Sequence, residues 1–178
     1  LPQQFDSAAR PDLLRRYGTL IRQLGGLYST GPDVGTSPAD MDVIAETGAP
    51  FVHARTEAAG GRGDSGGPTA LGVFSGIEAT LEHLDGSASL TRKHVAVQGA
   101  GGVGGALIDL LIAAGARVSF TDLSPEVASR ASARGARFLP SEEIFDSSCD
   151  VFSPCALGGV LNRETIPRLR CRAVVGGA

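Results

Sequence analysis

The sequence predicts an α/β fold built on a doubly wound parallel sheet. From residue 94 onward, short apolar segments with strand character alternate with helical segments. A glycine-rich turn joins the first of these strands to the first helix. Strands that alternate with helices form right-handed βαβ units, and the strands of such units are parallel. Three further helical segments precede this region, so the sheet is expected to occupy only the later part of the chain.

The first part of the chain is expected to contain two helices and one short extended segment. Apolar residues at helical spacing predict an amphipathic helix over about 8–24, which Gly25 and Gly26 end. A β-compatible segment, 27–30, runs into a turn at Gly31-Pro32-Asp33. A second helix begins at Ser37-Pro38-Ala39-Asp40, where Ser37 suits the N-cap and Asp40 completes a capping box. It is expected to end near residue 47.

A glycine-rich loop over 56–67 is the clearest hinge in the sequence. We therefore place a domain boundary there, with residues 1–65 before it and 66–178 after it. Pro68 opens a helix whose apolar residues repeat every three to four positions. The later elements are expected in this order: strand 94–98, helix 103–114, strand 116–121, a helix from Ser124-Pro125, strand 136–138, a helix near 141–146, and strands at 149–152 and 173–176.

The composition excludes several classes of function. Hydrophobic residues make up 42% of the chain and charged residues 20%, as in ordinary globular proteins. The net charge of -3 provides no basic field for nucleic acid or an anionic membrane surface. The longest apolar run, 106–116, contains Asp109 and is too short to span a bilayer. We expect a small-molecule partner, with no nucleic acid and no membrane.

The three cysteines indicate the compartment. Their number is odd and no Cys-x-x-Cys spacing occurs, which argues against a disulfide framework and against a zinc site. Reduced thiols favour a cytoplasmic location. The three histidines show no spacing that supports a metal, so we expect none. The first residues, 1–5, lack an initiator Met and a secretion-signal pattern, and we interpret them as a truncated start.

The glycine-rich turn matches a dinucleotide-binding fingerprint. The strand 94–98 runs directly into Gly99-Ala100-Gly101-Gly102-Val103-Gly104, which has the pattern Gly-x-Gly-x-x-Gly. The first glycine permits a tight turn, the second lets a pyrophosphate approach the backbone, and the third allows close packing of helix and strand. Amides at the start of the helix then face the phosphates. Alone, this pattern also fits an ordinary glycine-rich turn.

Asp122 strengthens the fingerprint and predicts the cofactor. It ends the second strand of the same unit, where a carboxylate can accept hydrogen bonds from the ribose hydroxyls. It would repel a 2'-phosphate, and Leu123-Ser124 offers no arginine to bind one, so NAD is favoured over NADP. Asp122 also fits a helix-cap role before Ser124-Pro125. The sequence therefore predicts a Rossmann-type NAD-binding domain over 66–178; Gln98 argues against a methyltransferase, which usually has an acid there.

Several ordered segments resemble the glutamate, leucine, phenylalanine and valine dehydrogenase family, and in particular its shorter branch, which acts on apolar amino acids. The matching segments cover nearly the whole chain: Thr30 to Thr36, Ala39-Asp40-Met41-Asp42, Gly67 to Val73, Cys149 to Gly159 and Glu164-Thr165-Ile166-Pro167. The resemblance implies an NAD-dependent amino-acid dehydrogenase that converts leucine, valine or phenylalanine to the 2-oxo acid and ammonium. It also implies that residues 1–65 are the C-terminal part of an α/β substrate-binding domain.

The resemblance assigns roles to residues outside the glycine turn. Asp33 falls on the family's catalytic aspartate, which exchanges a proton with the substrate amine; without the family, Pro32-Asp33 is a turn dipeptide. Gly31 falls near a substrate-pocket position. Thr69 matches a position on the nicotinamide side of the cofactor. Pro154, Cys155 and Ala156 match a loop along the cofactor ribose, where Cys155 is expected to pack and not to act as a nucleophile.

Other family features are not matched in this chain. The family carries two active-site lysines in a segment before the first helix, and the single lysine here, Lys93, lies just before the nucleotide-binding strand. The sequence also stops near the family's Asn-rich loop, so residues 66–178 are expected to be a C-terminally incomplete NAD-binding domain. We therefore expect the 178-residue fragment to be inactive and the full-length protein to be a homo-oligomer.

Alternative functions stay open on the sequence alone. They are a non-catalytic NAD-binding fragment or relic, a glutamate dehydrogenase, and another Rossmann oxidoreductase. The choice among amino acids is not readable from the sequence.

Overall fold

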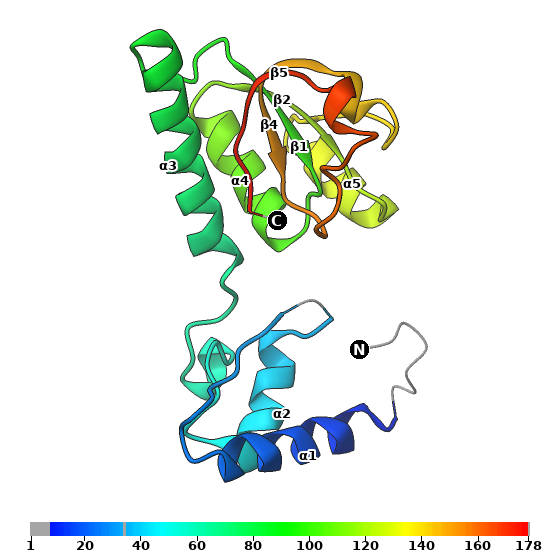
Figure 1. The fold of residues 1–178 in the computed structure, drawn as a ribbon. Helices are drawn as coiled ribbons and strands as arrows, with labels where there is room; N and C mark the ends of the chain where they lie inside the picture. The colour runs from blue at the N-terminus through cyan, green and yellow to red at the C-terminus, as the bar shows by residue number, and fades with distance from the viewer. Residues whose placement is uncertain (1–7, 34, 178) are drawn as a thin grey trace. The chain divides into compact units, whose positions relative to one another are not determined.

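The chain divides into two compact units, and the boundary between them falls between Ser65 and Gly66. The computed structural model describes residues 8–33 and 35–177 (Figure 1). Residues 1–5, interpreted above as a truncated start, lie outside the described residues. Within the described part, no helix is both long enough and apolar enough to cross a membrane.

The first unit is built on two helices that pack against each other, α1 (Arg10–Gln23) and α2 (Pro38–Gly48). Gly18 of α1 lies against α2, where an added Cβ would be only 2.3 Å from the carbonyl oxygen of Ile44. The helices therefore approach closely because this position has no side chain. One apolar cluster joins them to the segment that follows: Leu14, Met41, Ile44, Ala45 and Val52.

Among the described residues of the first unit, extended structure is limited to one parallel bridge between Thr30 and Val52. The amide of Thr30 donates to the carbonyl of Phe51, and the amide of His53 donates to the carbonyl of Thr30. The rest of the predicted segment 27–30 forms no strand, because Leu27 and Tyr28 are exposed and bury no common face. A short 3-10 turn, η1 (Glu57–Ala59), then interrupts the glycine-rich loop.

The start of α2 is held by the capping box expected from the sequence. The Ser37 hydroxyl accepts the amide of Asp40, and the Asp40 carboxylate accepts the amide of Ser37. Arg10 of α1 also donates two hydrogen bonds of 2.9 Å to the two carboxylate oxygens of Asp40. The bonds from Arg10, helped by those from Ser37 and opposed by desolvation, lower the pKa of Asp40 to about 2.

Replacing Arg10 by glutamine is expected to lower the free energy of unfolding at neutral pH slightly, because its ion pair with Asp40 is lost. The folded-state pKa of Asp40 lies below its unfolded value, so this contribution is present above about pH 4 and is lost as the pH falls towards 2. Urea unfolding followed by circular dichroism at pH 7 and pH 2 measures both effects. An Arg16→Gln control, at an exposed position of α1, should change neither; equal losses in the two variants would refute the assignment.

The second unit contains a parallel sheet of five strands in the order β3-β2-β1-β4-β5. The strands are β1 (His94–Gln98), β2 (Arg117–Thr121), β3 (Arg137–Phe138), β4 (Ser148–Pro154) and β5 (Arg170–Val174). Because β1 lies between β2 and β4, the chain order reverses beside it, and the carboxyl ends of β1 and β4 flank the switch point where doubly wound folds bind ligands. The predicted α/β fold class is confirmed.

Three helices accompany the sheet: α3 (Gly66–Asp85), α4 (Gly102–Ala113) and α5 (Pro125–Ala133). They contribute to one large core with the strands, whose bulkiest members include Ile77, Leu81, Leu107, Leu111, Val97 and Phe120. A smaller cluster contains Ala96, Ile144, Cys149 and Phe152. Neighbouring residues of one strand, such as Ala96 and Val97, enter different clusters because successive side chains point to opposite faces of a sheet.

In the second unit, two of the predicted elements differ in the structure. The helix expected near 141–146 is a single 3-10 turn, η2 (Ile144–Asp146), because Ile144 is fully buried and β4 begins at Ser148. The last strand was expected at 173–176, but β5 begins at Arg170 after a 3-10 turn, η3 (Ile166–Arg168). The two arginines of β5 interrupt the apolar pattern by which a strand is predicted from sequence.

One of the two arginines of β5 is held in the sheet by ion pairs. Arg172 donates to both carboxylate oxygens of Asp85, at the end of α3, and also to Asp150 of β4. Lys93 donates to the same Asp85 at 2.7 Å. Arg172 first and Lys93 second hold the pKa of Asp85 well below its usual range. The single lysine is therefore an ion-pair partner at the amino end of β1.

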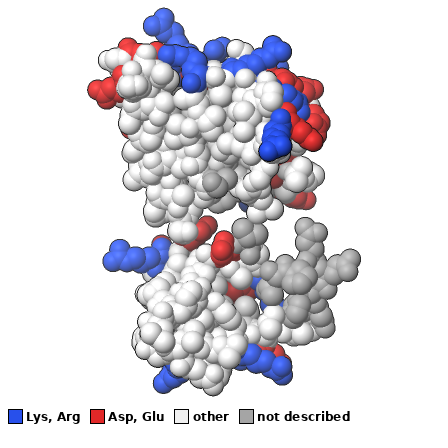
Figure 2. Space-filling model, viewed as in Figure 1, with Lys and Arg blue, Asp and Glu red and all other residues white. Residues whose placement is uncertain are grey.

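Charges of both signs are mixed on the face drawn in Figure 2. On this face of the second unit, several blue side chains lie next to one another with red ones to either side, and much of the remaining surface is uncharged.

Candidate functional site

The glycine turn after β1 has the geometry that its sequence pattern predicts. Gly99 adopts a φ of 92°, and an added Cβ would lie 2.6 Å from the Cβ of Ala156. At Gly104 an added Cβ would lie 1.9 Å from the carbonyl oxygen of Gly99. At Gly101, by contrast, an added Cβ would meet no atom within 4 Å. Two of the glycines thus allow close packing, and the third leaves open space.

The open space lies at the start of α4. Gly101 is the N-cap of this helix, and no side chain caps it. The first amides of a helix have no partner within the helix, so those of Gly102, Val103 and Gly104 can donate to an external acceptor. They also lie at the positive end of the helix dipole. This arrangement can bind a phosphate or pyrophosphate group.

Asp122 follows β2 and contacts the glycine turn directly. Its Oδ2 accepts the backbone amide of Ala100 at 2.8 Å, and its Oδ1 accepts the amide of Ser124 at 2.9 Å. The carboxylate therefore fixes the glycine turn, and it also holds the turn that leads into α5, whose N-cap is Ser124. Each oxygen retains capacity for a further donor. The Ser124 hydroxyl separately caps α5 by accepting the amide of Val127.

A cavity of about 380 Å³ lies beside Gly99 and Asp122. Its remaining lining comes from the ends of β1 and β2 and from the segments around β4: Gln98, Thr121, Leu123, Ser141, Glu142, Phe145, Ala156, Leu157, Gly158 and Val160. The Oε1 atom of Gln98 is buried, and no hydrogen-bond partner is found for it. The cavity thus combines two carboxylates, those of Asp122 and Glu142, with polar and apolar neighbours.

The loop after β4 lies along the glycine turn. The amide of Cys155 donates to the carbonyl of Gln98 at 2.7 Å, which continues the β1–β4 ladder past Pro154. Ala156 lies against Gly99, and the Cys155 Cβ lies 3.2 Å from a Cβ added at Gly104. The Cys155 thiol is 3.5 Å from the Ser153 hydroxyl. Pro154, Cys155 and Ala156 are therefore brought to the glycine turn, with Cys155 in a packing position.

Thr69 lies in the first turn of α3, at the same edge of the sheet. The start of α3 lies close to the start of α4, since a Cβ added at Gly66 would be 2.8 Å from the carbonyl carbon of Gly102. A Cβ added at Gly177 would lie 3.5 Å from Thr69 and 3.1 Å from Val103. Thr69 is exposed. The fold therefore brings it to the glycine turn from a distant part of the sequence.

Asp33 and Gly31 belong to the first unit and line a different cavity, of about 400 Å³. Apolar and aromatic residues of both helices and of the segment between them complete it: Leu13, Leu14, Tyr17, Tyr28, Thr30, Thr36, Met41 and Ile44. The backbone of Asp33 is held by Thr36, whose hydroxyl accepts the Asp33 amide at 2.8 Å and donates to its carbonyl at 2.9 Å. The turn thus fixes Asp33 through its backbone and leaves its side chain exposed.

Sequence reasoning did not identify most of the cavity lining. It predicted no role for Ser141 or Phe145, because the short crossover between β3 and β4 looked like a helix, and none for Val160, which lies in the segment after β4. Tyr17 and Tyr28 were assigned to a helix face and an extended segment, and nothing in their spacing connects them to Asp33. The phenolic oxygen of Tyr17 lies 3.1 Å from the Thr30 hydroxyl, a contact that only the folded chain reveals.

The cysteines and histidines form no recognisable reactive centre among the described residues. All three cysteines are free thiols. Burial, reinforced by Cys171, raises the pKa of Cys149 to about 12, so this thiol is kept protonated. In the described ranges, no group of three or more histidine, cysteine or acidic side chains is arranged to hold a metal ion.

Comparisons with known proteins agree with the resemblance in the sequence. Residues 60–127 match the family model for glutamate/leucine/phenylalanine/valine dehydrogenase. The chain is 42% identical to a leucine dehydrogenase of Thermoactinomyces intermedius over 167 residues, which are 93% of this chain and 45% of that protein. It is 38% identical to a phenylalanine dehydrogenase of Caldalkalibacillus thermarum over 174 residues, 94% of this chain and 47% of that one.

A solved structure supports the fold over the whole chain. It is a hetero-hexameric glutamate dehydrogenase from Thermus thermophilus in a leucine-bound form, with a TM-score of 0.78 and 26% identity. The match covers 100% of this chain and 48% of that one. The chain thus spans about half the length of the proteins it matches. Together, these segments and this fold identify the chain as a member of the glutamate/leucine/phenylalanine/valine dehydrogenase family.

Proposed function

We propose that residues 66–178 bind NAD at the carboxyl edge of the sheet. The observation that carries this proposal is the cavity lined by Asp122 and Gly99, together with the uncapped start of α4 at the end of the same glycine turn. The first amides of α4 would hold the pyrophosphate, and Asp122 the adenosine ribose. Thr69, Pro154, Cys155 and Ala156 would lie along the rest of the cofactor, and Gly101 would leave room for it. Bound there, NAD supplies the hydride acceptor.

Asp122 also supports a preference for NAD over NADP. A 2'-phosphate on the adenosine ribose would bring negative charge against this carboxylate. The next residue, Leu123, is 90% exposed and offers no positive charge to compensate. Asp122 already accepts two amides, so a ribose hydroxyl would be an additional donor to it.

The cofactor preference is tested with Asp122→Ala and Asp122→Asn. We expect the wild-type chain to bind NADH more tightly than NADPH, and both variants to narrow that ratio, because each removes the repulsive charge. Asp122→Asn keeps an oxygen for one of the two amides, so it should preserve thermal stability better than Asp122→Ala. Fluorescence titration with both nucleotides gives the ratio, and Glu82→Gln, at an exposed position of α3, is the charge-matched control. Equal wild-type affinities for NADH and NADPH would refute the NAD assignment.

For the full gene product, we propose oxidative deamination of an apolar L-amino acid to the 2-oxo acid and ammonium. The names of the relatives support leucine or phenylalanine as substrates, and the family description adds valine. Asp33 would accept a proton from the substrate ammonium group, which must be neutral before hydride leaves the α-carbon. Gly31, beside Asp33 in the same cavity, would leave room for the substrate side chain. We expect no turnover from the 178-residue chain alone, since its one lysine is paired with Asp85.

The described lining of the Asp33 cavity favours an apolar substrate over glutamate. It contains aliphatic and aromatic residues and no arginine or lysine. A second substrate carboxylate would therefore lack a cationic partner there and would cost free energy to desolvate. Relative kcat/KM values for leucine, valine, phenylalanine and glutamate measure this preference. A preference for glutamate would contradict the proposal and support a glutamate dehydrogenase instead.

The assembly and location of the full gene product are also proposals. The hetero-hexameric glutamate dehydrogenase among the matches supports an oligomer, and we propose a homo-oligomer for this protein. The three free thiols fit a reducing, cytoplasmic compartment. Light scattering on the purified full-length protein measures the first proposal, and fractionation of the source cells measures the second.

A further inference from the structure

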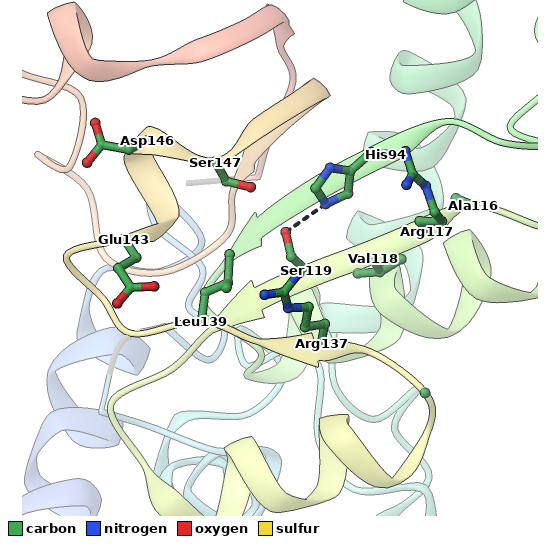
Figure 3. A pocket seen from close by; sticks show the side chains of 11 residues that line it. His94, Ala116, Arg117, Val118, Ser119, Arg137, Leu139, Glu143, Asp146 and Ser147 are labelled. Atoms are coloured by element: carbon green, nitrogen blue, oxygen red, sulfur yellow. Dashed lines mark hydrogen bonds between the residues drawn. The ribbon is translucent and has the colours of Figure 1, made fainter.

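A second cavity lies in the same unit as the nucleotide cavity, at the opposite edge of the sheet. It has a volume of about 700 Å³ and opens beside the amino ends of β1 and β2, beside β3 and beside the segment that leads to β4 (Figure 3). His94 starts β1, whereas Gln98 of the nucleotide cavity ends it. Four residue steps in a strand separate the two positions by about 13 Å. A ligand here would therefore not occupy the nucleotide cavity.

Two arginines line this cavity from neighbouring strands. The register pairs Arg117 with His94 and Arg137 with Ser119, so all four side chains belong to one face of the sheet. Within the described part of the chain, neither guanidinium forms an ion pair or a side-chain hydrogen bond, unlike those of Arg168 and Arg172. Two unpaired guanidinium groups on one face form a site suited to an anion.

A fixed histidine and a buried hydroxyl lie between the arginines. The Nδ1 atom of His94 lies 2.8 Å from the carbonyl oxygen of Ser148, and because a carbonyl only accepts, Nδ1 carries a proton. Its Nε2 atom lies 2.9 Å from the Ser119 hydroxyl, as the dashed line in Figure 3 marks. Ser119 is only 2% exposed. The floor of the cavity is thus a built polar group and not a chance arrangement of surface side chains.

The acidic residues of the lining lie on the opposite wall. Asp146 is neutralised by Arg168, which donates to its Oδ2 at 2.7 Å. Glu143 comes from the same segment, and Figure 3 shows its carboxylate away from the His94 ring. An anionic group is therefore attracted to the strand side, and the wall with Glu143 favours a hydrogen-bond donor at the other end of the ligand.

We propose that this cavity binds a small organic anion, through a phosphate or carboxylate group held by Arg117 and Arg137 beside His94. Its volume suits a metabolite-sized molecule. A bound anion would contact the amino ends of β1, β2 and β3. The carboxyl ends of β1 and β2 carry the glycine turn and Asp122. The site is independent of the proposed dehydrogenase activity, and its test needs no turnover.

The test follows the ring proton of His94 by NMR during titration with inorganic pyrophosphate and, separately, with citrate at constant ionic strength. The chain has only three histidines, so His53 and His83 serve as internal references. We expect a saturable shift confined to His94 for at least one probe, and the comparison of the two tells phosphate from carboxylate recognition. In the Arg117→Gln/Arg137→Gln double variant the dissociation constant should rise at least about tenfold.

Two controls keep this test decisive. Arg130→Gln, at an exposed position of α5, makes the same charge change elsewhere and should retain the shift. Arg137→Lys keeps the charge and should bind with an intermediate constant, which also guards against a folding defect in the double variant. The proposal is overturned if neither probe gives a saturable shift, if all three histidines move in parallel, or if the double variant binds like the wild type.

Discussion

Replacing Asp33 by asparagine in the full gene product should lower kcat for the amino-acid substrate by about 10²–10⁴-fold, the usual contribution of a positioned general base. Asparagine has nearly the same shape, but it cannot accept a proton from the substrate ammonium group. The turn should persist, because Thr36 holds residue 33 through its backbone amide and carbonyl. Melting temperature and NADH affinity should therefore change little.

The matched control is Asp12→Asn, which removes a carboxylate whose side chain is 78% exposed on α1. Steady-state kinetics with leucine, valine and phenylalanine, together with NADH titration, separate chemistry from binding. If Asp33→Asn turned over at nearly the wild-type rate, Asp33 would be a turn residue only. If the wild-type full gene product bound NADH without any turnover, the non-catalytic alternative would replace the proposed reaction.

The second large effect is expected from two alanine substitutions in the glycine turn, which should behave in opposite ways. Gly104→Ala should destabilise the second unit by about 1–3 kcal/mol or more, because its Cβ would overlap the carbonyl oxygen of Gly99 and the backbone must move. Gly101→Ala should fold like the wild type, since its Cβ meets no protein atom within 4 Å. It should nevertheless weaken NADH binding at least about tenfold, because that Cβ would occupy the pyrophosphate's approach.

Thermal unfolding by circular dichroism and NADH fluorescence titration measure the two effects on the same samples. Gly72→Ala, on an exposed part of α3 where an added Cβ also meets nothing, is the control for both measurements. A Gly101→Ala variant that binds NADH as tightly as the wild type would place the cofactor elsewhere. A Gly104→Ala variant of unchanged stability would mean that the turn yields more easily than its geometry indicates.

The sequence predicted those elements whose signal is local. The strand 94–98 is an apolar run next to a glycine pattern, and the start of α2 is a complete capping box, so each was readable without its neighbours. The glycine turn and Asp122 were also readable, since their spacing reflects one βαβ unit.

What the sequence did not predict depends on partners that are distant along the chain. The strand β5 was misplaced because Arg172 is stabilised by Asp85, 87 residues away. The segment before β4 was assigned to a helix, but burial of Ile144 stops it after one 3-10 turn. Similarly, the lining of the nucleotide cavity by Phe145 and Val160 follows from how the segments before and after β4 pack. Local patterns carry no information on such contacts.

Asp122 accepts two backbone amides, and these hydrogen bonds have a consequence for engineering the cofactor preference. On the proposed mode of binding, a change towards NADP would replace this carboxylate and add a cation at Leu123. The carboxylate also accepts the amide of Ala100, however. A substitution that only removes the carboxylate would therefore leave the phosphate-binding turn without this hydrogen bond, even before a nucleotide binds. A redesign that retains a neutral acceptor, such as Asp122→Ser with Leu123→Arg, keeps that anchor while removing the negative charge. Preorganisation of the turn and discrimination between the two nucleotides are thus separate properties of one side chain, and they have to be redesigned together.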